Sequence, residues 1–154
     1  MAETTWLDDN EQRTWRAYLT MNQVVMEALD RQMQRDADMP HAYYIVLAML
    51  SERDDRTMTM TDLAGIVGYS PSRLSHAVAR LEEQGWVRRD RHPTDRRTTL
   101  ARLTDEGMAV VVATAPGHVA EVQRVLFDQL SPEQTASLGE IARAVISGCD
   151  RPTA

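Results

Sequence analysis

The sequence lacks lysine, has a single cysteine and contains no long hydrophobic run. One thiol, Cys149, cannot form an internal disulfide, and no CxxC pair or Cys/His spacing indicates a metal site. The longest apolar stretch, near Met108, is far shorter than the roughly 18–20 residues of a membrane-spanning helix. The acidic N-terminal residues do not resemble a signal peptide. We therefore expect a cytoplasmic protein that has no metal or other cofactor and does not enter a membrane.

Sequence motifs of catalysis are missing as well. The chain has no phosphate-binding glycine loop, no HExxH pair and no recognisable Ser/His/Asp arrangement, so we predict that it is not an enzyme. The histidines are scattered along the chain, which favours surface or helix-capping positions over metal ligation. They are His41, His76, His92 and His118.

Arginine, by contrast, is present and is unevenly distributed. Residues 71–102 hold eight arginines and four carboxylates, a net charge of +4. The rest of the chain holds nine arginines and nineteen carboxylates, a net charge of −10. A basic segment on an acidic body is the charge pattern of a protein that binds a polyanion through one face. A GC-rich coding sequence also explains the use of arginine in place of lysine, so the clustering of the charge carries the argument.

Hydrophobic periodicity predicts a long helix at the start of the chain, over residues 6–36. Asp8 is its expected N-cap, with Glu11 as the capping-box partner. Pro40 interrupts the pattern, and a second helix follows from about residue 41 to residue 52.

A helix-turn-helix pattern follows in the middle of the sequence. The alternating residues 57–60 predict a short strand, and Thr61 is the expected N-cap of a helix that ends at Gly68. Ser70 and the proline after it predict the start of a second helix over 71–84. Two helices joined by a tight glycine-containing turn are typical of DNA-binding helix-turn-helix units.

Two strands over residues 86–91 and 98–103, joined by the polar turn HPTDRR, predict a β-hairpin directly after the second helix. Helix, turn, helix and hairpin together make a winged helix. Another helix should begin at Thr104, kink near residue 113 ahead of Pro116 and resume to about Gln129. The capping sequence SPEQ then opens a last amphipathic helix. The predicted fold is mainly α, with a small β-hairpin wing.

The exposed face of the second helix carries candidate base-reading residues. Its apolar face is formed by Leu74, Ala77, Val78 and Leu81. The first turns of the opposite face are small and polar, which lets a helix approach the major groove and hydrogen-bond base edges. These residues are Ser72, Arg73, Ser75 and His76. An ordinary solvated face of an amphipathic helix explains the same pattern.

The tip of the predicted hairpin adds a second basic feature. Arg96 and Arg97 lie at or near the tip, and Arg88, Arg89 and Arg91 lie on the strand that leads to it. Such a tip suits a phosphate backbone or a narrow minor groove. Asp95 is either a solvated turn acid or, as we favour, a partner that holds an arginine side chain in position.

These segments resemble the MarR family of transcriptional regulators. The resemblance rests on TMTMTDLAGIVGYSPSRLSHAVARLEEQGWVRR and RHPTDRRTTLARLTDEG, which include the D-R-R tip and the L-T-x-x-G motif at Leu103, Thr104 and Gly107. It covers nearly the whole chain. It implies a single domain over 1–154, in which the helices 6–36 and 105–147 form a homodimer and 41–103 is the DNA-binding lobe.

The resemblance also implies a function. The dimer is expected to bind double-stranded DNA at a near-palindromic operator, most simply as a repressor. Ser72, Arg73, Ser75 and His76 are expected to read the major groove, and Arg97, supported by Asp95, to enter the minor groove. The expected phosphate contacts are Arg96, Ser70 and Arg80. A winged helix that binds a protein partner, or a non-specific architectural DNA binder, is the alternative.

Members of this family often respond to aromatic acids, metals or oxidants. The sequence has no cysteine near its N-terminus and no metal-ligand cluster, which leaves a small aromatic effector. The expected pocket lies between the dimerisation helices and the winged helix. Its candidate residues are Trp15, Tyr18, His41 and Tyr44, which core or interface positions explain as well.

Overall fold

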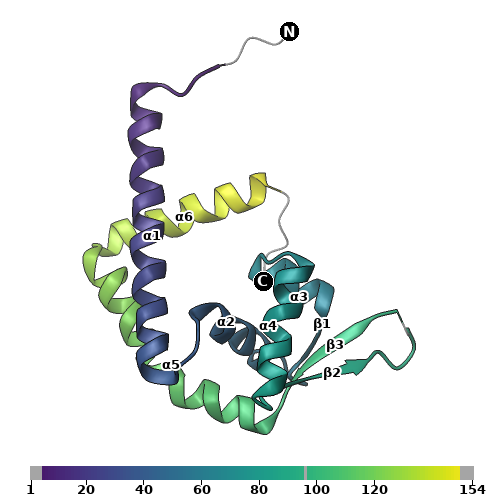
Figure 1. Cartoon of the computed structure of the whole chain (residues 1–154). Helices are drawn as coiled ribbons and strands as arrows, with labels where there is room; N and C mark the ends of the chain where they lie inside the picture. The colour runs from purple at the N-terminus through teal and green to yellow at the C-terminus, as the bar shows by residue number, and fades with distance from the viewer. Residues whose placement is uncertain (1–4, 96, 150–154) are drawn as a thin grey trace.

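A computed structural model describes residues 5–95 and 97–149, which form six α-helices and one three-stranded antiparallel sheet (Figure 1). The predicted fold class, mainly α with a winged helix-turn-helix, is confirmed. None of the helices in these residues is long and apolar enough to cross a membrane. The elements are α1 (Asp9–Ala37), α2 (His41–Ser51), β1 (Thr57–Thr59), α3 (Met60–Val67), α4 (Pro71–Glu83), β2 (Val87–Arg91), β3 (Thr99–Leu103), α5 (Asp105–Val125), the 3₁₀ helix η1 (Phe127–Gln129) and α6 (Pro132–Gly148).

Hydrogen bonds from capping side chains determine where α1 and α6 begin. The Asp8 carboxylate accepts hydrogen bonds from the backbone N–H of Asn10 and Glu11, and the Glu11 carboxylate accepts from the Asp8 N–H. The predicted capping box is therefore confirmed, and because Asp8 is the cap, α1 begins three residues later than we predicted. The same arrangement at Ser131 and Gln134 opens α6.

The winged-helix lobe, residues 41–103, contains most of the buried core. Helices α2, α3 and α4 pack together and against one face of the sheet, whose strand order is β1-β3-β2. The predicted short strand pairs with β3 in the register Met58 opposite Ala101, and both side chains are buried. The central leucines are fully buried, and they are Leu47, Leu50, Leu63, Leu74 and Leu81.

The turn between α3 and α4 has the predicted glycine but a different first cap. Gly68 adopts the left-handed conformation, with φ of 71°, and ends α3 as expected. The cap at the start of α3, however, is Thr59 and not Thr61. The Thr59 hydroxyl accepts from the Asp62 N–H at 3.0 Å and donates to the Asp62 carboxylate at 2.7 Å. Strand β1 therefore passes directly into α3.

The L-T-x-x-G motif joins the wing to α5. Thr104 caps α5 as predicted, accepting from the Gly107 N–H at 3.0 Å and donating to the Gly85 carbonyl at 2.7 Å. A Cβ at Gly107 would overlap the carbonyl of Trp86, so this glycine lets α5 begin against the segment that joins α4 to β2. The motif therefore fixes the angle at which the helix leaves the lobe.

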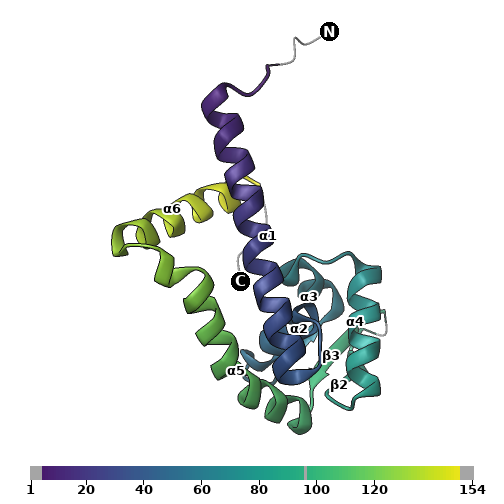
Figure 2. The same cartoon turned by 60° about the vertical axis from the view of Figure 1, so that its left-hand side comes forward.

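Helix α5 differs from its prediction. It runs without a break through Pro116, ends at Val125, and is followed by η1 over the residues that we expected to complete the helix. Figures 1 and 2 show that α5 changes direction along its length, as an internal proline favours. The Thr114 hydroxyl donates to the Val110 carbonyl inside the helix.

The first half of α1 and the whole of α6 project beyond the lobe (Figures 1 and 2). We call α1 from residue 9 to residue 27, together with α6, the arms. The buried residues of α1 all lie later in the helix, from Ala28 to Met33, where it packs against α5. Helix α6, described along its whole length, has no buried residue. The arms nevertheless expose large hydrophobic side chains, among them Trp15, Tyr18, Leu19, Val24, Ile141, Val145 and Ile146.

Candidate nucleic-acid interface

Helix α4 presents the polar face that its sequence predicts. Its four predicted core residues are buried, whereas Ser72, Arg73 and His76 are exposed and Ser75 is half-buried. Ser70 caps the helix by accepting from the Arg73 N–H at 3.2 Å. Ser70 therefore fixes the start of α4, and the side chains of Ser72, Arg73 and His76 are exposed to solvent.

Asp95 organises the turn at the tip of the wing. Its carboxylate accepts from the Thr98 hydroxyl at 2.6 Å and from the Arg97 N–H at 3.0 Å, and these hydrogen bonds lower the pKa of Asp95. Among the residues that the structure describes, no guanidinium pairs with this carboxylate. Asp95 therefore shapes the turn, and its carboxylate does not pair with the guanidinium of the exposed Arg97. Arg96 lies outside the described residues.

The strands below the tip use their arginines differently. Arg89 donates from Nε to Glu82 at 2.7 Å, and its backbone N–H binds the same carboxylate at 2.8 Å. Arg88 and Arg102 both lie 3.2 Å from one oxygen of Asp90. Arg88, Arg89 and Arg102 are thus paired with carboxylates, and Arg88 and Arg89 lie on β2, the strand that leads to the tip, as predicted.

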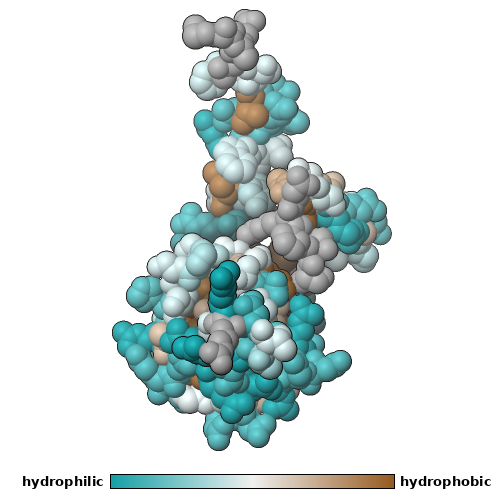
Figure 3. Space-filling model, turned by 90° about the vertical axis from the view of Figure 1, so that its right-hand side faces the viewer, coloured by the Kyte–Doolittle hydropathy of each residue, from teal (hydrophilic) through white to brown (hydrophobic). Residues whose placement is uncertain are grey.

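Only some arginines of this basic segment remain without a carboxylate partner among the described residues. Arg80, a predicted phosphate contact, pairs with Glu83 at 2.7 Å on the exposed side of α4. Within residues 71–95 and 97–102, the arginines without an ion pair are Arg73, Arg91 and Arg97. Figure 3 shows the largely hydrophilic surface of the lobe on the side of the wing, with hydrophobic groups on the arm above it.

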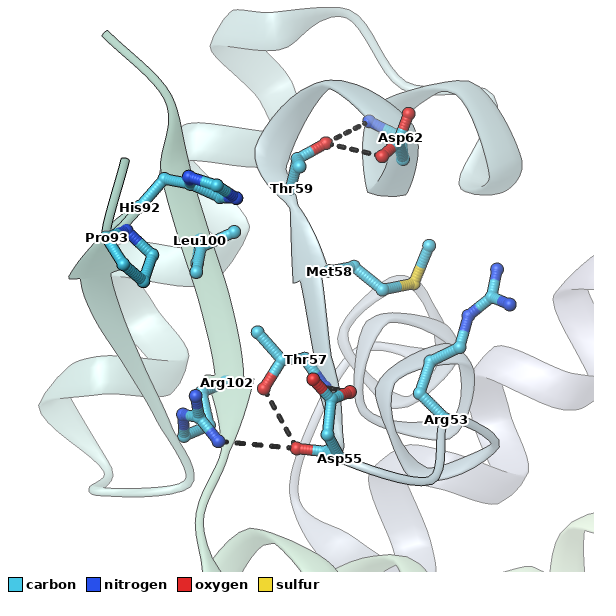
Figure 4. A pocket seen from close by; sticks show the side chains of 10 residues that line it. All are labelled: Arg53, Asp55, Thr57, Met58, Thr59, Asp62, His92, Pro93, Leu100 and Arg102. Atoms are coloured by element: carbon cyan, nitrogen blue, oxygen red, sulfur yellow. Dashed lines mark hydrogen bonds between the residues drawn. The ribbon is translucent and has the colours of Figure 1, made fainter. Parts of the chain in front are cut away.

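A hollow of about 590 Å³ lies on the outer face of the sheet, between β1, the start of α3 and the base of the wing (Figure 4). Arg102 crosses it, with Nη1 3.4 Å from the Asp55 carbonyl, and Thr57 donates to the same carbonyl at 2.9 Å. Asp55, Asp62 and Arg53 also line the hollow, so its arginines and carboxylates are equal in number. The first turn of α4 and the wing tip remain the better candidates for a DNA contact, because Arg73 and Arg97 have no ion pair among the described residues.

The chain shares sequence and structure with known regulators. The family model described as the MarR family matches residues 37–98. The MarR family transcriptional regulator Sco3205 of Streptomyces coelicolor, solved in complex with DNA, is 50% identical, with 99% of this chain and 95% of that chain covered and a TM-score of 0.92. This chain belongs to the MarR family. Its members are transcriptional regulators and not enzymes, in agreement with our prediction.

Two further relatives show how far the similarity reaches. AbsC of Streptomyces coelicolor is 36% identical, with 95% of this chain and 98% of that chain covered and a TM-score of 0.88. The regulator PecS of Dickeya dadantii is 33% identical over 79 residues, which cover 49% of this chain and 48% of the relative. The match to AbsC covers nearly the whole of both chains, so it includes the arms as well as the winged helix.

The four residues predicted to line an effector pocket in this MarR-family chain do not converge. Trp15 and Tyr18 stack on each other, with ring centroids 5.8 Å apart, on the exposed first half of α1. His41 and Tyr44 are buried at the start of α2, on the other side of the α1–α2 turn. At about 1.5 Å per residue, the end of α1 lies roughly 30 Å along the helix from Trp15. A single chain therefore does not build the predicted pocket.

His41 and Tyr44 instead form a cluster with His118 of α5, which the sequence analysis missed as a partner. The His118 ring lies 5.2 Å from that of His41 and 4.7 Å from that of Tyr44. The prediction of a surface or capping position is therefore wrong for His41. His41 and Tyr44 are neighbours on α2, but His118 is far from them in the sequence, and only the packing of α5 against α2 brings it to them.

Burial controls the ionisation of this cluster. It lowers the pKa of His41 to about 4, with a further contribution from His118, while Asp30 acts in the opposite direction. Burial also lowers the pKa of His118. The Asp30 carboxylate accepts from the His41 backbone N–H at 2.9 Å and so anchors α2 to α1. Nε2 of His41 and Nδ1 of His118 have no hydrogen-bond partner within the described part of the chain.

Proposed function

We propose that this MarR-family regulator binds DNA sequence-specifically as a homodimer and represses transcription from a near-palindromic operator. The observation that carries the proposal is the pairing of a capped helix α4, whose first turn is polar and exposed, with an arginine-bearing wing on the same lobe. The 50% identity to a relative solved in complex with DNA supports it over the whole chain.

The base contacts are assigned to the first turns of α4. Helix-turn-helix proteins insert this part of the second helix into the major groove. Serine, arginine and histidine donate to or accept from base edges there. The proposed reading residues are Ser72, Arg73, Ser75 and His76.

We assign the wing, together with the two ends of α4, to contacts with the DNA backbone and the minor groove. Arg97 enters the minor groove from a turn that Asp95 holds in shape, and Arg96 contacts the backbone beside it. Ser70 and Arg80 are the proposed phosphate contacts on α4. Because Arg80 pairs with Glu83, it must exchange a carboxylate for a phosphate, which reduces its net contribution.

A homodimer explains why the arms expose large apolar side chains. We assign residues 6–36 and 105–147 to dimerisation, residues 41–103 to DNA binding, and 1–154 to one domain. The apolar side chains of α6 and of the first half of α1 have no cover within the described chain, and a second copy buries such faces. Two lobes related by a two-fold axis then meet two half-sites about one helical turn apart. Occupying the operator is sufficient for repression, because it denies the polymerase the same DNA.

A small aromatic effector that releases the dimer from DNA is the last part of the proposal. Its remaining support is the cluster of His41, Tyr44 and His118, whose unpartnered ring nitrogens lie where the lobe meets α5. A hydroxybenzoate should raise the melting temperature of the wild type and lower its operator affinity, and His118→Phe should lose both effects. No shift in either quantity across a panel of hydroxybenzoates would remove the effector from the account.

The DNA-reading assignment is tested by sequence selection with variants. Ser72→Ala and His76→Ala should each change the base preferred at one position of each half-site, at a cost of about 1–3 kcal/mol per lost base contact. Thr99→Ala, an exposed position in β3, is the control and should leave the selected site unchanged. If both α4 variants select the wild-type site, the recognition face has been misplaced.

A further inference from the structure

Tyr69, in the turn between α3 and α4, is fixed at both of its ends. Its backbone N–H donates to the Ala64 carbonyl at 3.0 Å, and its hydroxyl donates to the Ala42 carbonyl of α2 at 3.3 Å. The ring packs against the core of the lobe and is half-buried. Burial raises the pKa of Tyr69, so the phenol remains a neutral hydrogen-bond donor. The ring therefore forms a rigid platform beside the first turn of α4.

Arg73 lies on this platform. The carbon at the centre of its guanidinium is 4.1 Å from the centroid of the Tyr69 ring, which is a cation–π contact. The Arg73 backbone is also fixed, because its N–H binds the Ser70 hydroxyl. In the described residues Arg73 has no acidic partner, in contrast to Arg80 and Arg89, whose guanidinium groups are engaged by carboxylates.

A stacked guanidinium keeps its hydrogen-bonding edge free. A ring covers only one face of a planar guanidinium that lies over it, and the N–H donors along the edge of the group keep the fork geometry that matches O6 and N7 of guanine. A long exposed arginine normally loses rotamer freedom when it binds, and a platform that restrains it beforehand reduces this loss. A carboxylate partner would restrain it too, but would occupy the same donors.

We propose that Tyr69 is a positioning residue, whose ring holds the Arg73 guanidinium ready to read a guanine in the major groove. The inference rests on the proposed function, since it requires that the first turn of α4 meets base edges. It adds a residue that touches no DNA itself and that lies outside the polar face of α4.

The test combines single and double variants in operator selection and affinity measurements. Tyr69→Leu should weaken binding to the selected operator about two- to fivefold, the range that a cation–π contact at an exposed site supplies. It should relax the preference for guanine at the same position as Arg73→Ala does. The salt dependence should not change, because no charge is removed.

Two comparisons separate positioning from a general effect on folding. Tyr69→Phe keeps the ring and loses only the hydroxyl, so it should retain the guanine preference of the wild type. In an Arg73→Ala background, Tyr69→Leu should cause no further loss of affinity, since the group that it positions is already gone. A melting curve of each variant records any change in the stability of the lobe.

The proposal is overturned if Tyr69→Leu weakens binding as much in the Arg73→Ala background as alone, because Tyr69 would then act through packing only. It is also overturned if Tyr69→Phe loses the guanine preference, or if Tyr69→Leu keeps it. In each of these cases the wild type still selects an operator, and the proposed function stands. If the wild type selects no sequence, the proposed function fails and this inference fails with it.

Discussion

The lobe and the arms are built from similar amphipathic helices but differ in what covers their apolar faces. In the lobe, Leu74 of α4 and Leu63 of α3 are 0% exposed, because α2 and the sheet close over them. In the arms, Ile141 and Val145 of α6 are 61% and 62% exposed. One chain therefore completes the core of the lobe but leaves these apolar faces of the arms exposed, as the proposed dimer explains.

This difference separates stability from assembly. Changes inside the lobe should affect the unfolding of each chain, and changes on the arms should affect association. Because the proposed mechanism needs two folded lobes at a fixed spacing, both kinds of change should weaken operator binding, the first through folding and the second through association. Measurements of stability, mass and operator affinity distinguish the two causes.

Charges placed on the apolar face of α6 should have the largest effect. Ile141→Asp with Val145→Asp should convert the dimer to a monomer, because burying unpaired carboxylates at an interface costs several kcal/mol. Light scattering measures the mass, and a gel shift should show loss of operator binding. Glu140→Gln, an exposed position of the same helix, is the matched control and should remain dimeric. A double variant that stays dimeric would place the dimer interface away from α6.

A cavity in the lobe should destabilise the chain without separating the protomers. Leu74→Ala removes a fully buried side chain and should lower the free energy of unfolding by about 2–5 kcal/mol. Denaturant unfolding measures this change. The mass of the folded protein should remain that of the wild type, and a variant that becomes monomeric would show that the lobe and the arms are not independent.

The wing tip should affect DNA binding and nothing else. Arg97 is exposed and has no ion pair among the described residues, so Arg97→Ala should leave the melting temperature unchanged. Operator affinity should fall by about 1–3 kcal/mol, as for the loss of a specific arginine contact. An unchanged affinity would remove the wing from the interface.

The contact between the lobe and α5 should be sensitive to acid. The pKa values of His41 and His118 are lowered in the folded state, so the unfolded chain binds more protons below its own histidine pKa of about 6.5. Stability should therefore fall as the pH decreases from about 6.5 towards 4, by roughly 1–2 kcal/mol between pH 7 and pH 5. His118→Gln should reduce the slope of stability against pH relative to the wild type. Equal slopes in the two proteins would contradict this assignment.

The sequence predicted the features that depend on neighbouring residues. Asp8 with Glu11 and Ser131 with Gln134 are capping boxes whose partners lie three residues apart, and both form as expected. The two strand-like segments around the polar turn HPTDRR also predicted the hairpin, and the buried face of α4 follows its helical spacing. Even the short strand at Thr57–Thr59 was recognised from its alternation.

Features that depend on contacts between distant segments were less predictable. Thr59 and Thr61 are equally good caps locally, and the pairing of β1 with β3 decides between them. Asp95 was expected to be a solvated turn acid or an arginine partner, and its hydrogen bonds to the Thr98 hydroxyl and the Arg97 amide depend on the geometry of the turn, which the sequence does not specify. His118 joined His41 through helix packing, for which the sequence holds no local signal. The base-reading residues remain predictions until DNA binding is measured.

The central claim is that this MarR-family chain reads a specific operator with two lobes held together by the arms. Selection from random DNA with the purified protein, repeated at two salt concentrations, tests it most directly. The account predicts an inverted repeat with half-sites about one helical turn apart and an affinity that falls steeply with salt. Weak binding without a preferred sequence would contradict it and would favour a winged helix that binds a protein partner.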